Sequence, residues 1–522
     1  MATDPTDKRS TARSAREGDP EAPAATRRIA GGTVARAVGE AVAKVASVLF
    51  YVVLARELGE ADFGDFIFGM SLAGVVLTMA AFGTDDLIAR EIARDHERVH
   101  RMFADTLALK LGLGAVGMVI IAAVLLVVGY PAETQIAVLL LAVAVWIEVL
   151  TKTVQAVMQG REEMTYIAAS LIVQRVSTAV AGIAILLTGG DLIGAALVMV
   201  GGSLLGFFSA LYWLYRRVAQ PRRDIDRARW MPLIKAGVPL GLVGITYALL
   251  LKLDASLLSF LKGGDNTEVG LYGAAFRLIE ATMFISWAFG GAVLPWFSRH
   301  GSNWKVSLAR GYELGLKGMT AMLVPIAVVF GVLAEPIIDL LYGDAFAGAV
   351  VPLQLLAVMT VLYGINTYVS VLMISRDRPG DFIRPAAIVL AQNVIFNFIL
   401  IPPLGATGAA INAVASGVLL AVLCLRASTA IVGRISLVAA FGPPALAGAA
   451  MAAVLAAAGA TLFIPALIAS GIAYGVVFLV VERLFFPNDF RLYVDLLKRR
   501  RSREEKAEIP ASAVATPGGL EP

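Results

Sequence analysis

The feature that most constrains this chain is a series of apolar stretches, each about twenty residues or more in length. The first runs from Ile29 to Leu54 and is rich in glycine and alanine. A helix of that length crosses a bilayer core of about 30 Å. Of the 522 residues 58% are hydrophobic and 16% are charged, whereas soluble proteins average about 45–50% and 25%. The sequence therefore predicts an all-α, multi-pass membrane protein, because such runs do not fit the short alternating strands of a transmembrane barrel.

Apolar windows bounded by charged residues, glycine or proline predict about fourteen transmembrane helices. The last four windows form two pairs joined by very short turns, so each pair must be a helical hairpin. The predicted ranges are approximately 29–54, 64–84, 105–129, 135–159, 165–188, 192–215, 232–261, 268–297, 313–333, 349–374, 384–401, 405–429, 435–458 and 460–481.

Lysine and arginine are divided unevenly between alternate connecting segments. If the N-terminus is inside, the outer turns contain only Arg56 and Lys262, and the other basic segments all lie inside. The positive-inside rule then predicts a protein of the cytoplasmic (inner) membrane with both ends in the cytoplasm. We interpret the basic segments as topology signals that also attract anionic lipid. They do not indicate nucleic-acid binding.

A weaker copy of the first unit recurs in mid-chain, in the apolar stretch 233–260. Aligning Gly64 with Gly270 brings Lys44 within two positions of Lys252. This duplication predicts two six-helix lobes in an inverted-V arrangement, followed by two accessory helices. The predicted parts are a disordered cytoplasmic tail 1–28, an N-lobe 29–215, a basic cytoplasmic linker 216–231, a C-lobe 232–429, accessory helices within 430–481, and a cytoplasmic tail 482–522 that is disordered from about 498.

Several ionisable residues fall inside the predicted helices. A charge at mid-helix costs about 2.5–3.5 kcal/mol even on a lenient insertion scale, so these side chains must face a water-filled cavity or one another. The bases are Arg36, Lys44, Lys152, Arg175, Lys252 and Arg277, and the acids are Glu40, Glu148, Asp254 and Glu280.

Spacing along the helices predicts some pairs among these charges. Glu148 lies four residues before Lys152, and Arg277 lies three before Glu280, so each pair shares a helix face. Arg175 has no local partner, which favours a role in ligand binding. If every acid is paired, two of the six bases remain, and a cavity with surplus positive charge suits an anion such as a lipid-linked pyrophosphate. The acids then line the cavity or couple transport to an ion. The alternative is that the charges only tie helices together.

Other chemistries find little support in the sequence. The single cysteine, Cys424, allows neither a disulfide within the chain nor a cysteine-based metal site. The three histidines lack metal-ligand spacing, and no P-loop is present, so we expect no metal, no cofactor and no ATP hydrolysis. Every predicted outer loop is short, the longest being about 334–349, which disfavours a membrane-bound glycan polymerase or glycosyltransferase. We therefore expect a protein that is not an enzyme.

Four segments of the chain resemble the polysaccharide-transporter family, which includes the Wzx-type O-antigen flippases of the multidrug/oligosaccharidyl-lipid/polysaccharide (MOP) exporter superfamily. The similarity extends over about residues 29–481, including the order and spacing of the segments. They read LARELGEADFGDFIF, IKAGVPLGLVGITYALLLKLDASLLSFL, EVGLYGAAFRLIEA and IIDLLYGDAF.

This resemblance implies two six-helix lobes around a central cavity, with alternating access. The implied activity is flipping of an undecaprenyl-pyrophosphate-linked oligosaccharide to the outer leaflet, for the biosynthesis of a surface polysaccharide such as O-antigen lipopolysaccharide. The implied partners are the lipid-linked oligosaccharide, membrane lipid, and the polymerase or chain-length machinery of the pathway. Cationic cavity residues of such flippases are thought to hold the pyrophosphate, and the positions carried over are Arg36, Lys44, Lys252 and Arg277.

Two other functions within the superfamily stay open. A flippase for lipid II-type peptidoglycan precursors differs only in its cargo. A MATE-like antiporter for cations or drugs needs an unpaired intramembrane acid, and the basic neighbours of the acids in this sequence disfavour it.

Overall fold

The computed structural model describes residues 22–80, 83–221, 225–299, 305–376, 378, 380–458 and 463–491. The predicted tail segments 1–21 and 492–522 lie outside these ranges. Within them the chain is helical and contains no β-strand, which confirms the predicted all-α class. The first helix begins at Ala22, so residues 22–28 of the predicted tail are helical, as alanine and arginine in this segment favour.

The long helices follow the predicted spans to within a few residues in most cases. Twelve helices of the described residues are long and apolar enough to cross a membrane. The long helices are α2 (Ala22–Ala80), α4 (Val99–Val128), α5 (Ala132–Gly160), α6 (Met164–Leu187), α7 (Leu192–Trp213), α8 (Trp230–Leu261), α9 (Thr267–Arg299), α10 (Lys305–Val332), α12 (Val350–Ser375), α13 (Gly380–Val432), α14 (Leu437–Ala458) and α15 (Phe463–Phe485).

Two of these, α2 and α13, are helical hairpins. Gly59 in α2 and Gly405 in α13 have non-helical backbone angles, with φ of 75° and 54°, a region that glycine enters without penalty. The ring centroids of Phe50 and Phe66 are 6.2 Å apart, whereas sixteen residues of straight helix span about 24 Å. The predicted turns near these glycines are therefore present. The total of fourteen membrane crossings stays a prediction.

Short helices occupy segments that lie largely between the predicted spans. The longest predicted outer loop, 334–349, folds into α11 (Ala334–Tyr342) and η4 (Asp344–Ala349). Residues 84–94, between the first hairpin and α4, form the separate helix α3, which buries Leu87, Ile88 and Ile92 on one face. The remaining short elements are α3 (Thr84–Arg94), η1 (His96–Arg98), η2 (Leu214–Val218) and η3 (Arg227–Arg229).

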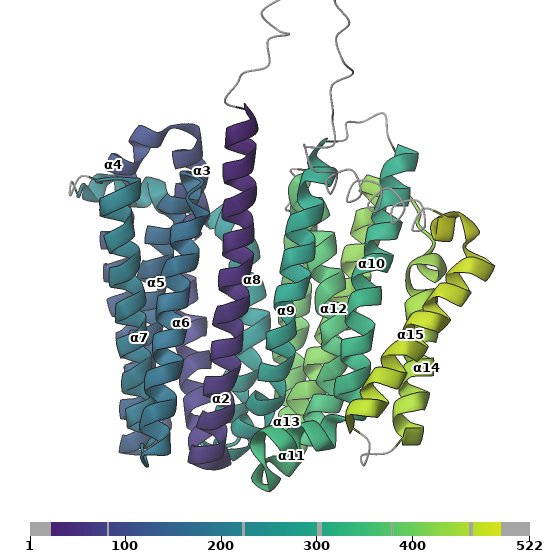
Figure 1. The fold of residues 1–522 in the computed structure, drawn as a ribbon. Coiled ribbons are helices and arrows are strands. Elements are labelled where there is room, and N and C mark those ends of the chain that lie inside the picture. Colours follow the sequence, from purple (N-terminus) through teal and green to yellow (C-terminus); the bar gives the residue numbers. More distant parts are fainter. Residues whose placement is uncertain are drawn as a thin grey trace, which may run out of the picture.

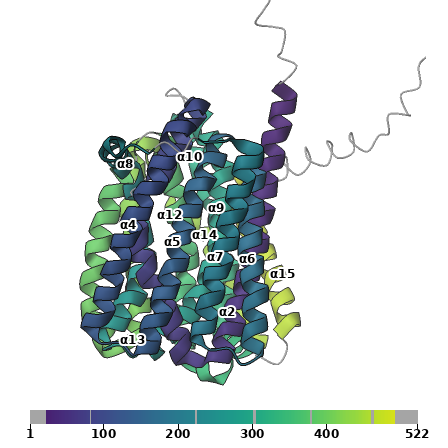
Figure 2. The same ribbon diagram turned by 90° about the vertical axis from the view of Figure 1, so that its left-hand side faces the viewer.

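The helices lie side by side and cross the molecule from end to end (Figures 1 and 2). In Figure 1, α5, α6 and α7 stand on one side, and α9, α10, α12 and α13 stand on the other. The hairpin α2 packs against α5 and α6 on the first side and against α8 and α9 on the second. At the far edge, α14 and α15 pair with each other, and α14 packs on α10. The predicted boundaries of the lobes stay a prediction.

The two glycines aligned in the sequence repeat pack against each other. A Cβ atom on Gly64 would collide with the carbonyl group of Asn266, and a Cβ atom on Gly270 would collide with that of Glu60. Each of these carbonyls lies four residues before the other glycine. The contact is therefore reciprocal, as in an interface with two-fold symmetry. It holds α2 and α9 together at the end of the bundle that contains the turn after Gly59.

Buried charges that sequence analysis had missed tie other helices together. Lys317 of α10 is fully buried and lies 2.8 Å from Glu482 of α15 and 2.7 Å from Asp489. Lys110 of α4 is also buried and binds Asp85 of α3 at 2.5 Å. Both lysines fall in or beside segments whose other residues give an ordinary apolar pattern. Only their three-dimensional neighbours explain how the charge is tolerated.

Candidate functional site

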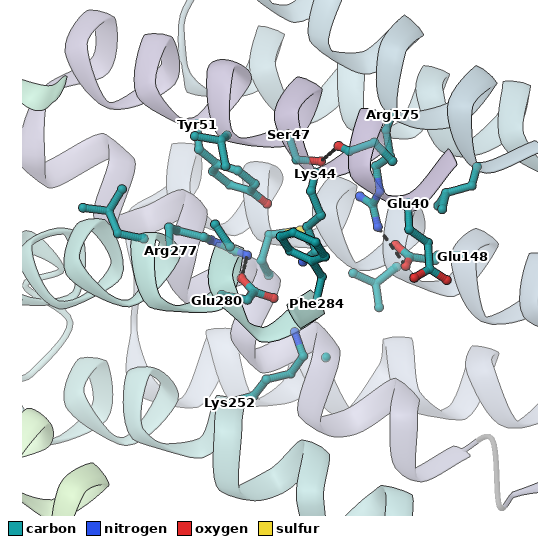
Figure 3. A pocket seen from close by; sticks show the side chains of 18 of the residues that line it. Glu40, Lys44, Ser47, Tyr51, Glu148, Arg175, Lys252, Arg277, Glu280 and Phe284 are labelled. Carbon is teal, nitrogen blue, oxygen red and sulfur yellow. Dashed lines mark hydrogen bonds and ion pairs between the residues drawn. The ribbon is translucent and has the colours of Figure 1, made fainter. Parts of the chain in front are cut away.

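A cavity of about 420 Å³ lies where α2, α5, α6, α8, α9 and α11 meet. Both halves of the α2 hairpin contribute to its wall. Five basic and three acidic side chains line it, which leaves a surplus of two positive charges among the described residues. These are Lys44, Lys152, Arg175, Lys252 and Arg277, with Glu40, Glu148 and Glu280. Figure 3 shows most of them converging from opposite walls.

Eight of the ten intramembrane charges that the sequence singled out therefore line one space. They come from five helices that are far apart in the sequence, and the mid-helix position of each charge brings them to one level of the bundle. The other two, Arg36 and Asp254, are absent from the described lining.

Two arginines of the cavity are held in ion pairs. Arg277 donates to Glu280 at 2.6 Å, as their spacing on α9 predicted. Arg175 of α6 donates to Glu148 of α5 at 3.1 Å. Arg175, which has no local partner in the sequence, is thus paired across the gap to another helix, and Glu148 does not form the expected ion pair with Lys152. The reason is that two basic side chains compete for Glu148. Arg175, across the gap between α5 and α6, binds it in place of Lys152, which lies four residues along the same helix.

Tyr51 adds a contact that the sequence did not indicate. The guanidinium carbon of Arg277 lies 4.1 Å from the centroid of the Tyr51 ring. A cation over an aromatic face is attracted by the ring quadrupole. Tyr51 and Glu280 thus fix the Arg277 side chain from two directions. In Figure 3 the three residues form one wall of the cavity.

Three lysines differ from the arginines because they form no ion pair within the described residues. These are Lys44, Lys152 and Lys252, each of which lines the cavity. The side chain of Lys252 lies against Gly74 on the opposite half of α2. A Cβ atom at Gly74 would lie 2.8 Å from its Cε and 2.9 Å from its Nζ. Gly74 therefore leaves the space through which Lys252 reaches the cavity.

Arg36 and Asp254 occupy different surroundings. Arg36 lies one helical turn before Glu40, which lines the cavity, and the two side chains form an ion pair at 3.1 Å. Asp254 is 1% exposed and accepts hydrogen bonds from Asn397 at 2.7 Å and Asn393 at 3.0 Å, both on α13. Asp254 thus points into the bundle of α8 and α13, away from the charged cavity. Its place on α8, two residues from Lys252, put the two side chains on different helix faces.

We expect Gly74→Ala to reduce the function of the cavity by about five- to tenfold, which corresponds to roughly 1 kcal/mol. The added methyl group displaces the Lys252 ammonium, while the fold tolerates the change because the colliding atoms belong to a flexible side chain. The measurement is transport by purified protein in liposomes. Gly201→Ala is the matched control, since a Cβ there meets nothing within 4 Å. In a Lys252→Ala background the Gly74 change should have no further effect, and two independent losses would contradict this explanation.

Known proteins resemble this chain in sequence and in fold. Residues 29–300 match the family described as polysaccharide biosynthesis protein. A probable low-salt glycan biosynthesis flippase of Haloferax volcanii is 23% identical over 368 residues, which cover 68% of this chain and 74% of that protein. A probable flippase of the same organism is 28% identical over 207 residues, covering 39% of this chain and 43% of that protein.

Solved structures show the same arrangement of helices. The lipid II flippase MurJ, in an inward closed conformation, superposes with a TM-score of 0.71 at 14% identity, over 87% of this chain and 99% of that one. An inward-facing multidrug transporter of the MATE family gives a TM-score of 0.61 at 18% identity, over 74% and 94%. At such identities the likeness shows the fold. Because the family match spans more than half of the chain, this protein belongs to the polysaccharide biosynthesis protein family, and its fold is that of MurJ and the MATE transporter.

Proposed function

We propose that the protein flips undecaprenyl-pyrophosphate-linked oligosaccharide units from the inner to the outer leaflet of the cytoplasmic membrane, for biosynthesis of a surface polysaccharide. The single observation that carries this proposal is the positive surplus of the cavity, where three unpaired lysines face a common space. A pyrophosphate is a compact anion with several acceptor oxygens. Lysines and arginines converging from several helices match it by charge and by hydrogen bonding.

The arrangement supports a division of roles among the basic residues. Lys44 and Lys252 provide ammonium groups that are free to turn toward an anion. Arg277 is fixed by Tyr51 and Glu280 and presents a pre-oriented guanidinium group. Lys152 and Arg175 extend the positive surface along the wall formed by α5 and α6. Arg36 lies outside the lining and serves, in this proposal, only to hold Glu40.

Alternating access follows if the two predicted lobes rock about the cavity. The reciprocal contact of Gly64 and Gly270 then closes one end, which is the outer end in the predicted topology. Arg56 reinforces this closure because its guanidinium group donates to the carbonyls of Leu341 at 2.7 Å and Leu340 at 2.5 Å. These carbonyls lie at the end of α11, where a cation also complements the helix dipole.

A cation or drug antiporter fits the cavity less well. Each of the three acids in the described lining forms an ion pair with an arginine. The pairs are Glu40 with Arg36, Glu148 with Arg175, and Glu280 with Arg277. No acid of the described lining is therefore left to attract a cation. A lipid II flippase would use the same pyrophosphate chemistry, and it stays a second candidate because the fold matches MurJ over nearly all of that protein.

Transport in liposomes tests the proposal. Purified full-length protein should flip a fluorescent undecaprenyl-pyrophosphate oligosaccharide at least about tenfold faster than the same glycan on undecaprenyl monophosphate, because one of two phosphates is then missing. Lipid II serves as the comparison cargo. Equal rates for mono- and pyrophosphate carriers would contradict a pyrophosphate site. A preference for lipid II over oligosaccharide carriers would establish the second candidate in its place.

A further inference from the structure

A second cavity adjoins the charged one. It has a volume of about 370 Å³ and lies between the second half of α2 and the helices α8, α9, α12 and α13. The size is typical of a ligand-binding pocket. Lys252, Arg277 and Glu280 line both cavities. These three side chains therefore stand at the boundary between the two spaces.

The second cavity is lined mainly by apolar and aromatic side chains. Phe276, Leu251 and Ile67 contribute to its wall, as does Trp287, whose side chain is 61% exposed. Large aromatic surface of this kind inside a bundle is costly to leave in contact with water. It favours an apolar occupant.

Three polar side chains of this wall, away from the boundary with the charged cavity, donate hydrogen bonds within the protein. The indole N–H of Trp287 donates to the Tyr363 hydroxyl at 2.6 Å. Ser71 donates to the Lys252 carbonyl at 3.0 Å, and Ser370 donates to the Thr367 carbonyl at 2.8 Å. A sugar needs several partners for its hydroxyl groups, and these side chains have committed their donors elsewhere. The wall thus suits a hydrocarbon better than a glycan.

We propose that this apolar chamber, between α8, α9 and α12, seats the first isoprenoid units of the lipid carrier. The proposal rests on the proposed function. A polyprenyl pyrophosphate joins an anionic head directly to an apolar chain. The boundary residues Lys252 and Arg277 hold the head, the chamber takes the adjoining isoprenoid units, and the charged cavity takes the glycan on the other side of the pyrophosphate.

Binding of prenyl pyrophosphates to the purified full-length protein tests this division. The probes are inorganic pyrophosphate, geranyl pyrophosphate and farnesyl pyrophosphate, with affinity measured by calorimetry. We expect the affinity to rise at least about tenfold from pyrophosphate to geranyl pyrophosphate, because the chain buries apolar surface. Farnesyl pyrophosphate should bind more tightly still.

Gly244→Leu is the informative variant. Gly244 lines the chamber, and a Cβ there meets nothing within 4 Å, so a larger side chain can start from this position and take up chamber space. It should remove most of the gain from the prenyl chain and leave the affinity for inorganic pyrophosphate within about twofold. Ala248→Leu, one turn along α8 in the same chamber, is a second filling variant in case the first does not fold.

Gly112→Leu is the matched control, because Gly112 is also helical and unobstructed but lies on α4, away from the chamber. It corrects for uptake of the prenyl chain by detergent. If the gain from the prenyl chain persists in Gly244→Leu and Ala248→Leu as it does in Gly112→Leu, the chamber assignment is wrong. If inorganic pyrophosphate itself fails to bind the unmodified protein, the result contradicts the pyrophosphate site of the proposed function and not the chamber assignment.

Discussion

Replacing Gly270 by leucine is expected to abolish flipping while the protein still inserts in the membrane. The Cβ position of Gly270 already collides with the Glu60 carbonyl, and a backbone group cannot move aside as a flexible side chain can. The bulk therefore forces α9 away from α2 at the end that holds both glycines. If that end is the outer gate, the variant is held with the gate open and cannot complete the transport cycle.

Thiol labelling measures this change directly. Cys424 is buried and is the only cysteine, so Cys424→Ser gives a cysteine-free background. Thr78→Cys then places one thiol in the wall of the charged cavity. A membrane-impermeant maleimide added from outside should leave the parent unlabelled and should label the Gly270→Leu variant. Gly201→Leu, at an unobstructed helical position, should behave as the parent does.

The reciprocal partner provides a second variant. Gly64→Leu should give the same phenotype, because Gly64 makes the equivalent contact with Asn266. If leucine prevents insertion, Gly64→Ala and Gly270→Ala apply the same displacement with a smaller side chain. Normal flipping with a cavity that stays closed from outside would show that these glycines serve packing and not gating.

The fold was largely predictable because few backbone structures can cross a lipid bilayer. Backbone polar groups in a bilayer must be satisfied within a helix, so apolar length alone located the spans. The turns in α2 and α13 were predictable because Gly59 and Gly405 follow apolar runs of a length that fits one crossing. Short helices such as α11 were not, since their periodicity covers too few residues to separate a helix from a loop.

The cavity was predictable for a related reason. A charge is costly in lipid, so the mid-helix positions of Lys44, Lys252 and Arg277 in the sequence predict a common interior space. The partners of these charges were not predictable. Which side chain faces Arg175 depends on how α5 and α6 are rotated against each other, and one sequence carries no signal of that rotation. The same holds for Lys317, whose acidic partners lie more than 160 residues further along the chain.

Asp254 shows where reasoning from spacing fails. It lies two residues from Lys252, and a helix turns by about 200° over two residues. The lysine therefore faces the cavity, and the acid faces α13, where two asparagines satisfy it. Sequence analysis grouped the two because both are intramembrane charges. Their helical positions already separated them.

Replacing Lys252 by alanine is expected to reduce flipping by about 10- to 100-fold, the loss that corresponds to one hydrogen-bonded charge. Insertion should be unaffected, because removing an unpaired intramembrane charge lowers the cost of burial. Lys252→Arg should restore part of the activity, since it keeps the charge but changes the geometry of the donors. Lys235→Ala is the matched control, because Lys235 lies on the same helix, is exposed, and does not line either cavity.

The competing view is that Lys252 only neutralises Glu280. The structure gives Glu280 a different partner, Arg277 at 2.6 Å, while Lys252 forms no ion pair with any described residue. The double variant Lys252→Ala with Glu280→Ala separates the two views by experiment. If Lys252 binds the pyrophosphate, removing Glu280 as well restores nothing, because the anion still lacks its ammonium partner. Recovery of flipping in the double variant would mean that the two charges balance each other, and the assignment of Lys252 to the substrate would have to be withdrawn.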